Sequence, residues 1–274
     1  MQLELRQLTP VIGSEVVDVD LEQATPQTIA AIKAALDERM VLVFRNQRLS
    51  REGHKRLGRC FGSGVLHRHA LATGPDPDVI PIKNDANSKF AIGEGWHTDV
   101  SCDETPIATS LLYVTQTPSN GGGDTLFANM NRAYETLSDP VKALIANLSA
   151  VHDGALPWKA GYGVDPKPGT QYPVFVHPIV VSHPNTGKPI LWVNRGFTTR
   201  IRGVTERESR YLLDMLLNHI EASPQIQCRV HWEPNTLVMW DNVATQHHAV
   251  WDYFPETRYG ERVSSVGGKL AAAA

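Results

Sequence analysis

Residues 240–248 read Trp-Asp-Asn-Val-Ala-Thr-Gln-His-His, and residues 96–100 read Trp-His-Thr-Asp-Val. Together the two segments offer a carboxylate at Asp99 and imidazoles at His97 and at His247 or His248. Two imidazoles and one carboxylate form the ligand set of a non-haem Fe(II) site that keeps coordination positions open. Side chains at i and i+2 of a strand share a face, so we expect His97 and Asp99 to lie in a strand. The distant histidine would then complete the metal site from a neighbouring strand.

The rest of the chain has the pattern of many short strands and a few helices. Helices are expected from Thr25, from Ser50, over residues 205–222, and over residues 131–148 with an interruption near Pro140. Short apolar or alternating runs predict strands at residues 3–8, 16–19, 41–44, 79–82, 109–115, 125–128, 174–181, 189–193, 227–232, 236–240 and 262–266. This pattern favours a mainly β fold with α decoration, built as a sandwich or barrel.

The domain organisation is expected to be simple. No internal repeat or linker stands out, so we expect a single domain over residues 1–268. Residues 269–274, which end in four alanines, look like a vector-derived tail and are left out of the fold prediction.

The composition argues against several classes of function. The chain has 274 residues, of which 42% are hydrophobic and 20% charged, as is typical of a globular protein. Its net charge of −3 and the lack of a basic run argue against nucleic-acid binding. No apolar run approaches the roughly 18 residues that cross a bilayer, so no membrane association is expected. The three widely spaced cysteines form no C-x-x-C pair, which argues against a disulfide framework or a structural zinc site and predicts a cytoplasmic protein.

A His-x-acid pattern is a weak signal by itself. The chain has two more such pairs, His219-x-Glu221 in an expected helix and His231-x-Glu233. The alternative for His97-x-Asp99 is a surface turn with a hydrogen-bonded histidine. The surroundings of the motif must therefore decide between the two interpretations.

Four stretches of the chain supply that context. Residues 96–106, 122–126 (Gly-Gly-Asp-Thr-Leu), 192–200 (Trp-Val-Asn-Arg-Gly-Phe-Thr-Thr-Arg) and 240–247 resemble motifs of the taurine dioxygenase (TauD/TfdA) family of Fe(II)/2-oxoglutarate-dependent oxygenases, in the expected order. The resemblance extends over roughly residues 3–266. It implies a double-stranded β-helix, the cupin-like jelly roll. It also implies a dioxygenase that uses Fe(II), 2-oxoglutarate and O₂ to hydroxylate a substrate and releases succinate and CO₂.

The resemblance also decides which histidine binds the metal. His247 and His248 would point to opposite sides of an extended segment, and alternation alone leaves the choice between them open. In the family the ligand follows Thr-x, here Thr245-Gln246, which selects His247. The implied metal ligands, which are also the catalytic residues, are His97, Asp99 and His247. Halogenating relatives replace the carboxylate, so Asp99 argues against halogenation.

Further residues acquire expected roles from the resemblance. The far carboxylate of 2-oxoglutarate needs a cation, and the planar guanidinium of arginine suits a carboxylate. The family places this role on Arg258, assisted by the hydroxyl of Thr125. Without the resemblance, Arg258 would be taken for a solvated surface charge and Thr125 for an ordinary strand residue. The implied substrate-binding groups are His69, the backbone N–H of Val100, the aromatic ring of Phe197, and Arg262.

The chain departs from the taurine enzyme at two positions that bear on the substrate. Ala72 stands where that enzyme has a tyrosine, and Gly93 stands where it has an asparagine. Both differences remove polar groups and enlarge the pocket. We therefore expect an anionic substrate that is bulkier or more apolar than taurine: a sulfonate, sulfate ester, aryloxyalkanoate or acylated amino acid.

Other functions use the same residues. The iron site could instead perform desaturation or ring formation in a biosynthetic pathway. A non-catalytic metal-binding jelly roll, or a zinc hydrolase with two histidines and a carboxylate, would leave the expected 2-oxoglutarate residues unexplained. Relatives are commonly homo-oligomers, so a dimer or tetramer is expected.

Overall fold

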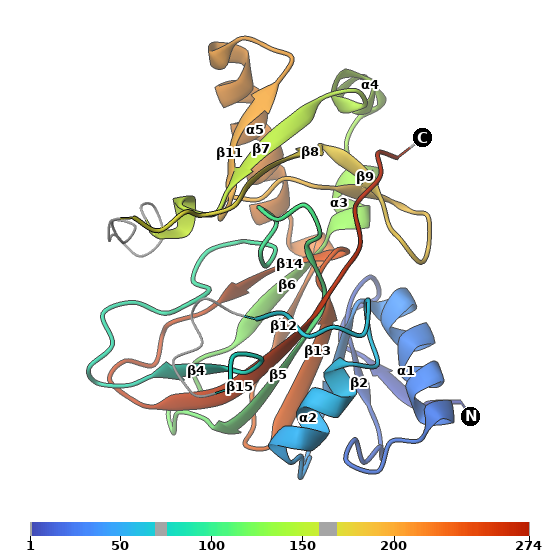
Figure 1. Cartoon of the computed structure of the whole chain (residues 1–274), viewed down its shortest axis with the longest axis vertical. Coiled ribbons are helices and arrows are strands. Elements are labelled where there is room, and N and C mark those ends of the chain that lie inside the picture. Colours follow the sequence, from blue (N-terminus) through green and yellow to red (C-terminus); the bar gives the residue numbers. More distant parts are fainter. Residues whose placement is uncertain (1, 69–75, 159–168, 274) are drawn as a thin grey trace.

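The computed structural model describes residues 2–68, 76–158 and 169–273. Its strands form a seven-stranded sheet, two three-stranded sheets and a two-stranded sheet (Figure 1). The helices are α1 (Pro26–Arg39), α2 (Arg51–Gly58), α3 (Met130–Glu135), α4 (Asp139–Ile145) and α5 (Glu206–Glu221). The strands are β1 (Leu5–Gln7), β2 (Ser14–Val16), β3 (Val41–Phe44), β4 (Ile80–Asn84), β5 (Ile107–Gln116), β6 (Thr125–Asn129), β7 (Ser149–Asp153), β8 (Val174–Pro178), β9 (Val180–Ser182), β10 (Pro189–Leu191), β11 (Thr198–Arg202), β12 (Gln227–Val230), β13 (Thr236–Asp241), β14 (Thr245–Ala249) and β15 (Arg258–Val266).

Two facing sheets form the expected jelly roll. The larger sheet has the order β1-β2-β3-β13-β5-β15-β4, and the smaller has the order β12-β6-β14. Alternation along β13 divides its side chains between two hydrophobic clusters, with Val238 and Trp240 in the interior and Leu237 and Met239 on the opposite face. Trp240 meets Phe127 of β6 with ring centroids 5.6 Å apart, which joins the two sheets across the interior.

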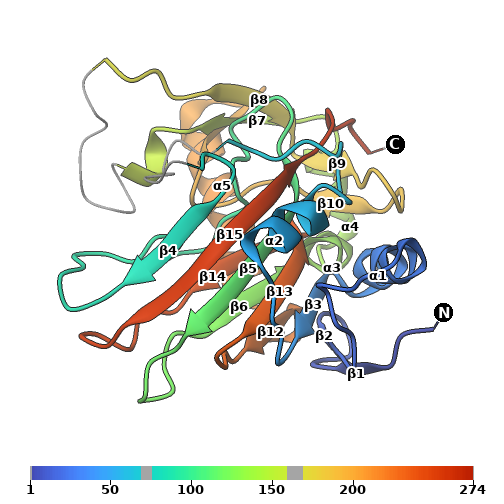
Figure 2. The same cartoon turned by 60° about the horizontal axis from the view of Figure 1, so that its bottom comes forward.

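Two N-terminal helices cover the outer face of the larger sheet. Thr25 and Ser50 cap α1 and α2 with their side chains, as the sequence predicts. Apolar residues of both helices, such as Leu36 and Leu57, pack against Leu237 and Met239. Figure 2 shows α1 and α2 on this side of β3, β13, β5 and β15. The site that carries the chemistry lies on the other face.

A second layer at one end of the jelly roll combines α5 with the sheet β11-β7-β8. Helix α5 begins with a capping box between Thr205 and Glu208, and its apolar face enters the main core. Strands β7 and β11 were not predicted from the sequence. Residues 150–152 are all buried, so β7, which pairs with β8 on one side and β11 on the other, shows no alternation of exposed and buried residues.

The C-terminal residues take part in the fold. Ala271 accepts a hydrogen bond from the backbone N–H of Ser182 (2.9 Å), and Ala273 donates one to Val180 (3.1 Å). The alanines that were left out of the fold prediction thus extend the β10-β9 sheet by an additional edge segment. In the described part of the chain, no helix has the length and apolarity needed to cross a membrane.

Candidate active site

The two segments that carry the expected metal ligands meet at a single bridge. His97 and His247 exchange backbone hydrogen bonds of 3.0 and 2.8 Å, and His247 lies in β14. The expectation that His97 and Asp99 both lie in a strand is wrong, because the chain turns at Asp99 and Val100 directly after this bridge. Val100 has a φ of 51°, a left-handed conformation that is costly for a β-branched side chain. The turn brings the carboxylate of Asp99 back toward the two imidazoles.

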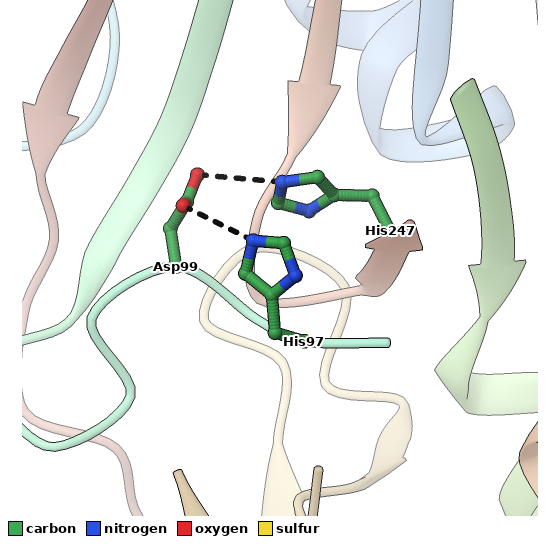
Figure 3. Close-up of side chains that lie close together, drawn as sticks. All are labelled: His97, Asp99 and His247. Atoms are coloured by element: carbon green, nitrogen blue, oxygen red, sulfur yellow. Dashed lines mark ion pairs between the residues drawn. The ribbon is translucent and has the colours of Figure 1, made fainter. Parts of the chain in front are cut away.

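The three side chains point toward one another (Figure 3). Asp99 Oδ1 lies 3.7 Å from His97 Nε2, and Asp99 Oδ2 lies 3.9 Å from His247 Nε2. One ligand atom from each residue lies within 4.8 Å of the others, and no other group of three metal-ligand side chains converges in this way in residues 2–68, 76–158 and 169–273. These separations suit three ligands that share one face of an ion.

The protonation states also suit a metal. Burial lowers the pKa of His247 well below its usual value, and the nearby His97 lowers it further. Burial likewise lowers the pKa of His97, against the opposing charge of Asp99. His97 Nδ1 lies 2.9 Å from the carbonyl oxygen of Gly95, and this contact leaves Nε2 free as a ligand atom. Neutral imidazoles and an ionised carboxylate are the forms that bind metal, so the three residues fit Fe(II).

Asp99 is fixed by side chains from three other segments. Asn242 accepts a hydrogen bond from the backbone N–H of Asp99 and donates one to its carbonyl oxygen, both 3.0 Å long. Ser110 Oγ donates to Asp99 Oδ2 over 3.2 Å. One nitrogen of Arg262 donates to both carboxylate oxygens, at 2.9 and 3.0 Å. The orientation of the carboxylate is therefore set before any ion binds.

Arg258 lies in the same cavity with incomplete hydrogen bonding. Its side chain is buried, with 4% of the residue exposed, and its guanidinium stacks over Trp232 at 4.9 Å. The buried Nε and Nη2 atoms have no hydrogen-bond partner in the described structure. Burial lowers the pKa of Arg258, although an arginine remains charged at neutral pH. A buried charge with free donors needs an anion, and a carboxylate has the matching two-pronged geometry.

Thr125 complements Arg258. Trp232 Nε1 donates a hydrogen bond of 3.0 Å to Thr125 Oγ1, so the indole uses one acceptor site of the hydroxyl. The hydroxyl hydrogen remains available for an acceptor in the cavity. Arg258 and Thr125 together thus fit the distal carboxylate of 2-oxoglutarate.

A cavity of about 660 Å³ joins the metal ligands to Arg258. Its wall includes Val100, Phe197 and Arg262, three of the four expected substrate-binding residues; the fourth, His69, lies outside the described residues. The remaining wall is largely apolar and includes Ile92, Cys102, Leu156, Pro157, Trp158 and Tyr172.

Two glycines border the metal ligands. A Cβ atom on Gly196 would lie 2.6 Å from His97 Cβ, so a side chain there would displace the ligand. Gly93, with a φ of +88°, faces His97 Cε1, which would lie 3.4 Å from a Cβ at that position. The absence of a side chain at Gly93 leaves space in the cavity beside the metal ligands.

The other histidines are used differently. His248 lines the cavity and meets Trp96 edge-on with ring centroids 5.8 Å apart, while His247 provides the convergent imidazole. His219 Nε2 lies 2.9 Å from the carbonyl oxygen of Ala133, and His231 Nδ1 lies 2.9 Å from Asp124. The two further His-x-acid pairs therefore have structural partners of their own.

Three residues of the site were not predicted from the sequence. Asn242 lies in the motif at residues 240–247, and its place in this motif is the only feature of the sequence that points to a role. Trp232 lies inside the His231-x-Glu233 pair, which was considered only as a possible metal-binding pattern. Nothing in the sequence points to Ser110, because its contact with Asp99 depends on how β5 packs.

Comparison with known proteins agrees with this geometry. The family described as "Taurine catabolism dioxygenase TauD, TfdA family" matches residues 4–264. An alpha-ketoglutarate-dependent sulfonate dioxygenase of Saccharomyces cerevisiae is 34% identical over 92% of this chain, which spans 64% of the length of that relative. An alkylsulfatase of Acinetobacter baylyi is 32% identical over 97% of this chain and 86% of its own length. The crystal structure of a taurine dioxygenase from Burkholderia xenovorans superposes with a TM-score of 0.85 and 33% identity, covering 99% of this chain and 92% of that one.

Proposed function

Because this chain belongs to the TauD/TfdA family of alpha-ketoglutarate-dependent dioxygenases, we propose that it hydroxylates a small organic anion: a sulfonate, sulfate ester, aryloxyalkanoate or acylated amino acid. The reaction converts 2-oxoglutarate and O₂ to succinate and CO₂, with one oxygen atom entering the substrate and the other entering succinate. The observation that carries this proposal is one cavity containing both the His97–Asp99–His247 group and the unpaired donors of Arg258.

His97, Asp99 and His247 would hold Fe(II), which with 2-oxoglutarate and O₂ supplies the oxidising chemistry for a C–H bond. Asn242 holds the backbone of Asp99 and Ser110 holds its carboxylate, while burial lowers the pKa of both histidines and favours their neutral form. The contribution of the protein is placement, because a ligand set fixed in advance needs little reorganisation during the reaction.

Arg258 and Thr125 would bind the distal carboxylate of 2-oxoglutarate. The arginine offers two buried donors, and Trp232 directs the Thr125 hydroxyl by occupying one of its acceptor sites. Burial strengthens these hydrogen bonds because little water competes for them.

Arg262, the backbone N–H of Val100, Phe197 and His69 are the proposed substrate-binding groups. Support comes from the first three, which line the cavity beside the metal ligands. Arg262 also contacts Asp99, so the substrate anion would lie close to the metal ligands. The apolar wall around Trp158 and Tyr172, with no side chain at Gly93, favours a substrate with a larger and more apolar body than taurine.

The names of two relatives support the anionic part of this substrate class. The Saccharomyces cerevisiae protein is named for sulfonates, and the Acinetobacter baylyi protein is named an alkylsulfatase. Oxidation of the carbon that bears a sulfate ester or an ether gives an unstable hydroxylated product, which collapses to a carbonyl compound and releases the leaving group.

The test has two stages. Anaerobic addition of 2-oxoglutarate to the Fe(II)-loaded protein should produce a weak visible charge-transfer band, which should be lost in His97→Ala and Asp99→Ala. A panel of sulfonates, sulfate esters, aryloxyalkanoates and acylated amino acids is then screened for substrate-dependent succinate release, with product analysis to separate hydroxylation from desaturation or ring formation. Folded, iron-loaded protein without the band would refute the proposal, and efficient turnover of taurine would refute the larger-substrate part.

We also propose a cytoplasmic homo-oligomer, either a dimer or a tetramer. The free thiols of Cys60, Cys102 and Cys228 are in keeping with a reducing compartment. Light scattering coupled to size exclusion tests the oligomeric state, and a monomeric mass at micromolar concentration would contradict it.

A further inference from the structure

A buried histidine outside the cavity hydrogen-bonds the carboxylate of Asp241. His183, which follows β9 and is 4% exposed, has its Nε2 atom 2.9 Å from Asp241 Oδ2. The backbone N–H of Thr186 donates to His183 Nδ1 over 3.2 Å, so the ring hydrogen lies on Nε2 and points at Asp241. Burial lowers the pKa of His183, but the hydrogen bond and charge of Asp241 outweigh burial and raise it overall. The pair is therefore a directed hydrogen bond to a buried carboxylate.

The other oxygen of Asp241 shapes the turn between β13 and β14. Asp241 Oδ1 accepts hydrogen bonds from the backbone N–H groups of Val243 (2.9 Å) and Ala244 (3.0 Å). The backbone oxygen of Asp241 accepts a third bond, of 2.7 Å, from the hydroxyl of Thr245. With His183 on Oδ2, both carboxylate oxygens accept hydrogen bonds, and these fix the orientation of the group. Loss of the His183 bond would leave a buried carboxylate oxygen without its donor, which favours rearrangement of the turn.

This turn contacts the segment that holds His97 and Asp99, and it leads into the strand that holds His247. Asn242, inside the turn, binds the backbone of Asp99 through two hydrogen bonds. Strand β14 begins at Thr245, whose carbonyl oxygen accepts a bond of 3.0 Å from Thr98, between His97 and Asp99. His247 follows two residues later in β14. The position of the turn thus determines how far His247 lies from Asp99.

We propose that His183 is a positioning residue for the metal centre, acting through Asp241 and the β13–β14 turn on the ligands His97, Asp99 and His247; this inference rests on the proposed function. His183 does not line the cavity and so has no direct contact with substrate or co-substrate. Its role differs from general packing because it acts through one hydrogen bond. A side chain at position 183 that still donates a hydrogen bond to Asp241 should therefore preserve the metal affinity of the site.

Two substitutions at position 183 separate its two hydrogen bonds. His183→Gln places an amide nitrogen near the position of Nε2 and can still donate to Asp241. His183→Asn reaches only as far as Nδ1, so it can accept from Thr186 but cannot reach Asp241. The control is His54→Leu, which removes another buried histidine whose Nε2 contacts the Leu111 carbonyl oxygen at 3.1 Å on the far side of the larger sheet.

The probe is Mn(II) alone, with its dissociation constant measured by electron paramagnetic resonance and the melting temperature recorded for each variant. Substitutions behind metal ligands typically weaken metal binding by about 10- to 100-fold, so His183→Asn should weaken Mn(II) binding by about tenfold. His183→Gln should stay within about threefold of the wild type. His54→Leu should melt at a lower temperature yet keep the wild-type Mn(II) affinity.

The outcomes separate this inference from the proposed function. Wild-type Mn(II) affinity in His183→Asn, or equal weakening in His54→Leu, would overturn the role of His183 and leave the metal site standing. A wild-type protein that binds no Mn(II), or binds it equally well in Asp99→Ala, would overturn the proposed metal site itself.

Discussion

Replacing Arg258 by methionine should stabilise the protein in the absence of 2-oxoglutarate and remove the stabilisation that 2-oxoglutarate provides. The guanidinium is buried, and two of its nitrogens have neither solvent contact nor a hydrogen-bond partner in the described structure. Each unsatisfied buried donor costs about 1–3 kcal/mol. The cation–π contact with Trp232 offsets about 0.5–2 kcal/mol of this cost. Methionine keeps an apolar stem against the indole and introduces no donor.

The two unsatisfied donors together cost about 2–6 kcal/mol, so the expected gain in unfolding free energy is about 3 kcal/mol after the lost cation–π contact is subtracted. At about 2–4 °C per kcal/mol, the melting temperature of the free protein should rise by several degrees. Binding of 2-oxoglutarate should weaken by about 30-fold or more, because losing one member of a buried charged hydrogen-bonded pair costs about 2–5 kcal/mol. Stability and co-substrate binding thus change in opposite directions.

The assay is thermal unfolding of Mn(II)-loaded protein with and without 2-oxoglutarate, together with calorimetric titration. Arg51→Met is the matched control, since Arg51 is half exposed and pairs with Glu261 at the surface. That change should alter stability by less than about 1 kcal/mol and leave 2-oxoglutarate binding intact. An Arg258→Met protein that melts below the wild type without 2-oxoglutarate would refute the reasoning, because the guanidinium would then have been stabilising the fold.

Three further predictions follow from local geometry. Gly196→Ala places a Cβ atom 2.6 Å from that of His97 and should weaken Mn(II) binding by about tenfold, the smaller of the effects that follow when the residues supporting a metal ligand are changed. The control is Gly268→Ala, whose Cβ atom would meet nothing within 4 Å. Equal Mn(II) affinities of the two variants would contradict the steric argument. Gly93→Asn should lower kcat/KM for a bulky anionic substrate relative to taurine, as measured by succinate release, and an unchanged ratio would show that this part of the cavity does not contact substrate. Burial lowers the pKa of His54 to about 4, so the unfolded chain, with a histidine pKa of about 6.5, takes up the proton first as the pH falls. The wild type should therefore lose on the order of 3 kcal/mol of unfolding free energy between pH 6.5 and pH 4 from this group, whereas His54→Gln should not. Denaturant unfolding of both proteins at pH 4.5 and 7.5 measures this loss. A difference in unfolding free energy between the two proteins that does not change with pH would contradict the prediction.

The parts of the fold and of the site that could be predicted are those that depend on residues close together in the sequence. Helix starts at Thr25 and Ser50 could be predicted because a capping hydroxyl acts within three residues. The identity of the metal ligands followed from residue types and a family pattern. The choice of His247 over His248 is consistent with the bridge to His97, which brings one imidazole to the carboxylate and leaves the other beside Trp96.

The support of the ligands could not be predicted because it depends on contacts between distant segments. Asn242 reaches Asp99 across 143 positions in the chain, and Ser110 reaches it from another strand. The expectation that His97 and Asp99 share a strand failed for the same reason. Their spacing satisfied the two-residue rule, but the amide of Asn242 stabilises a turn at Asp99, and the turn makes the carboxylate converge.

Arg258 and Arg262 lie on the same strand, although the strand predicted from the sequence included only Arg262. The expected strand began at residue 262, whereas β15 runs from Arg258 to Val266. Side chains four apart on one strand share a face, so both arginines enter the same cavity, about 13 Å apart along the strand at about 3.3 Å per residue. Gly260, between them on that face, has no side chain and packs closely against β5. One arginine therefore reaches Trp232 while the other reaches Asp99, and the single strand separates the proposed anchor for the co-substrate from the cation that contacts Asp99.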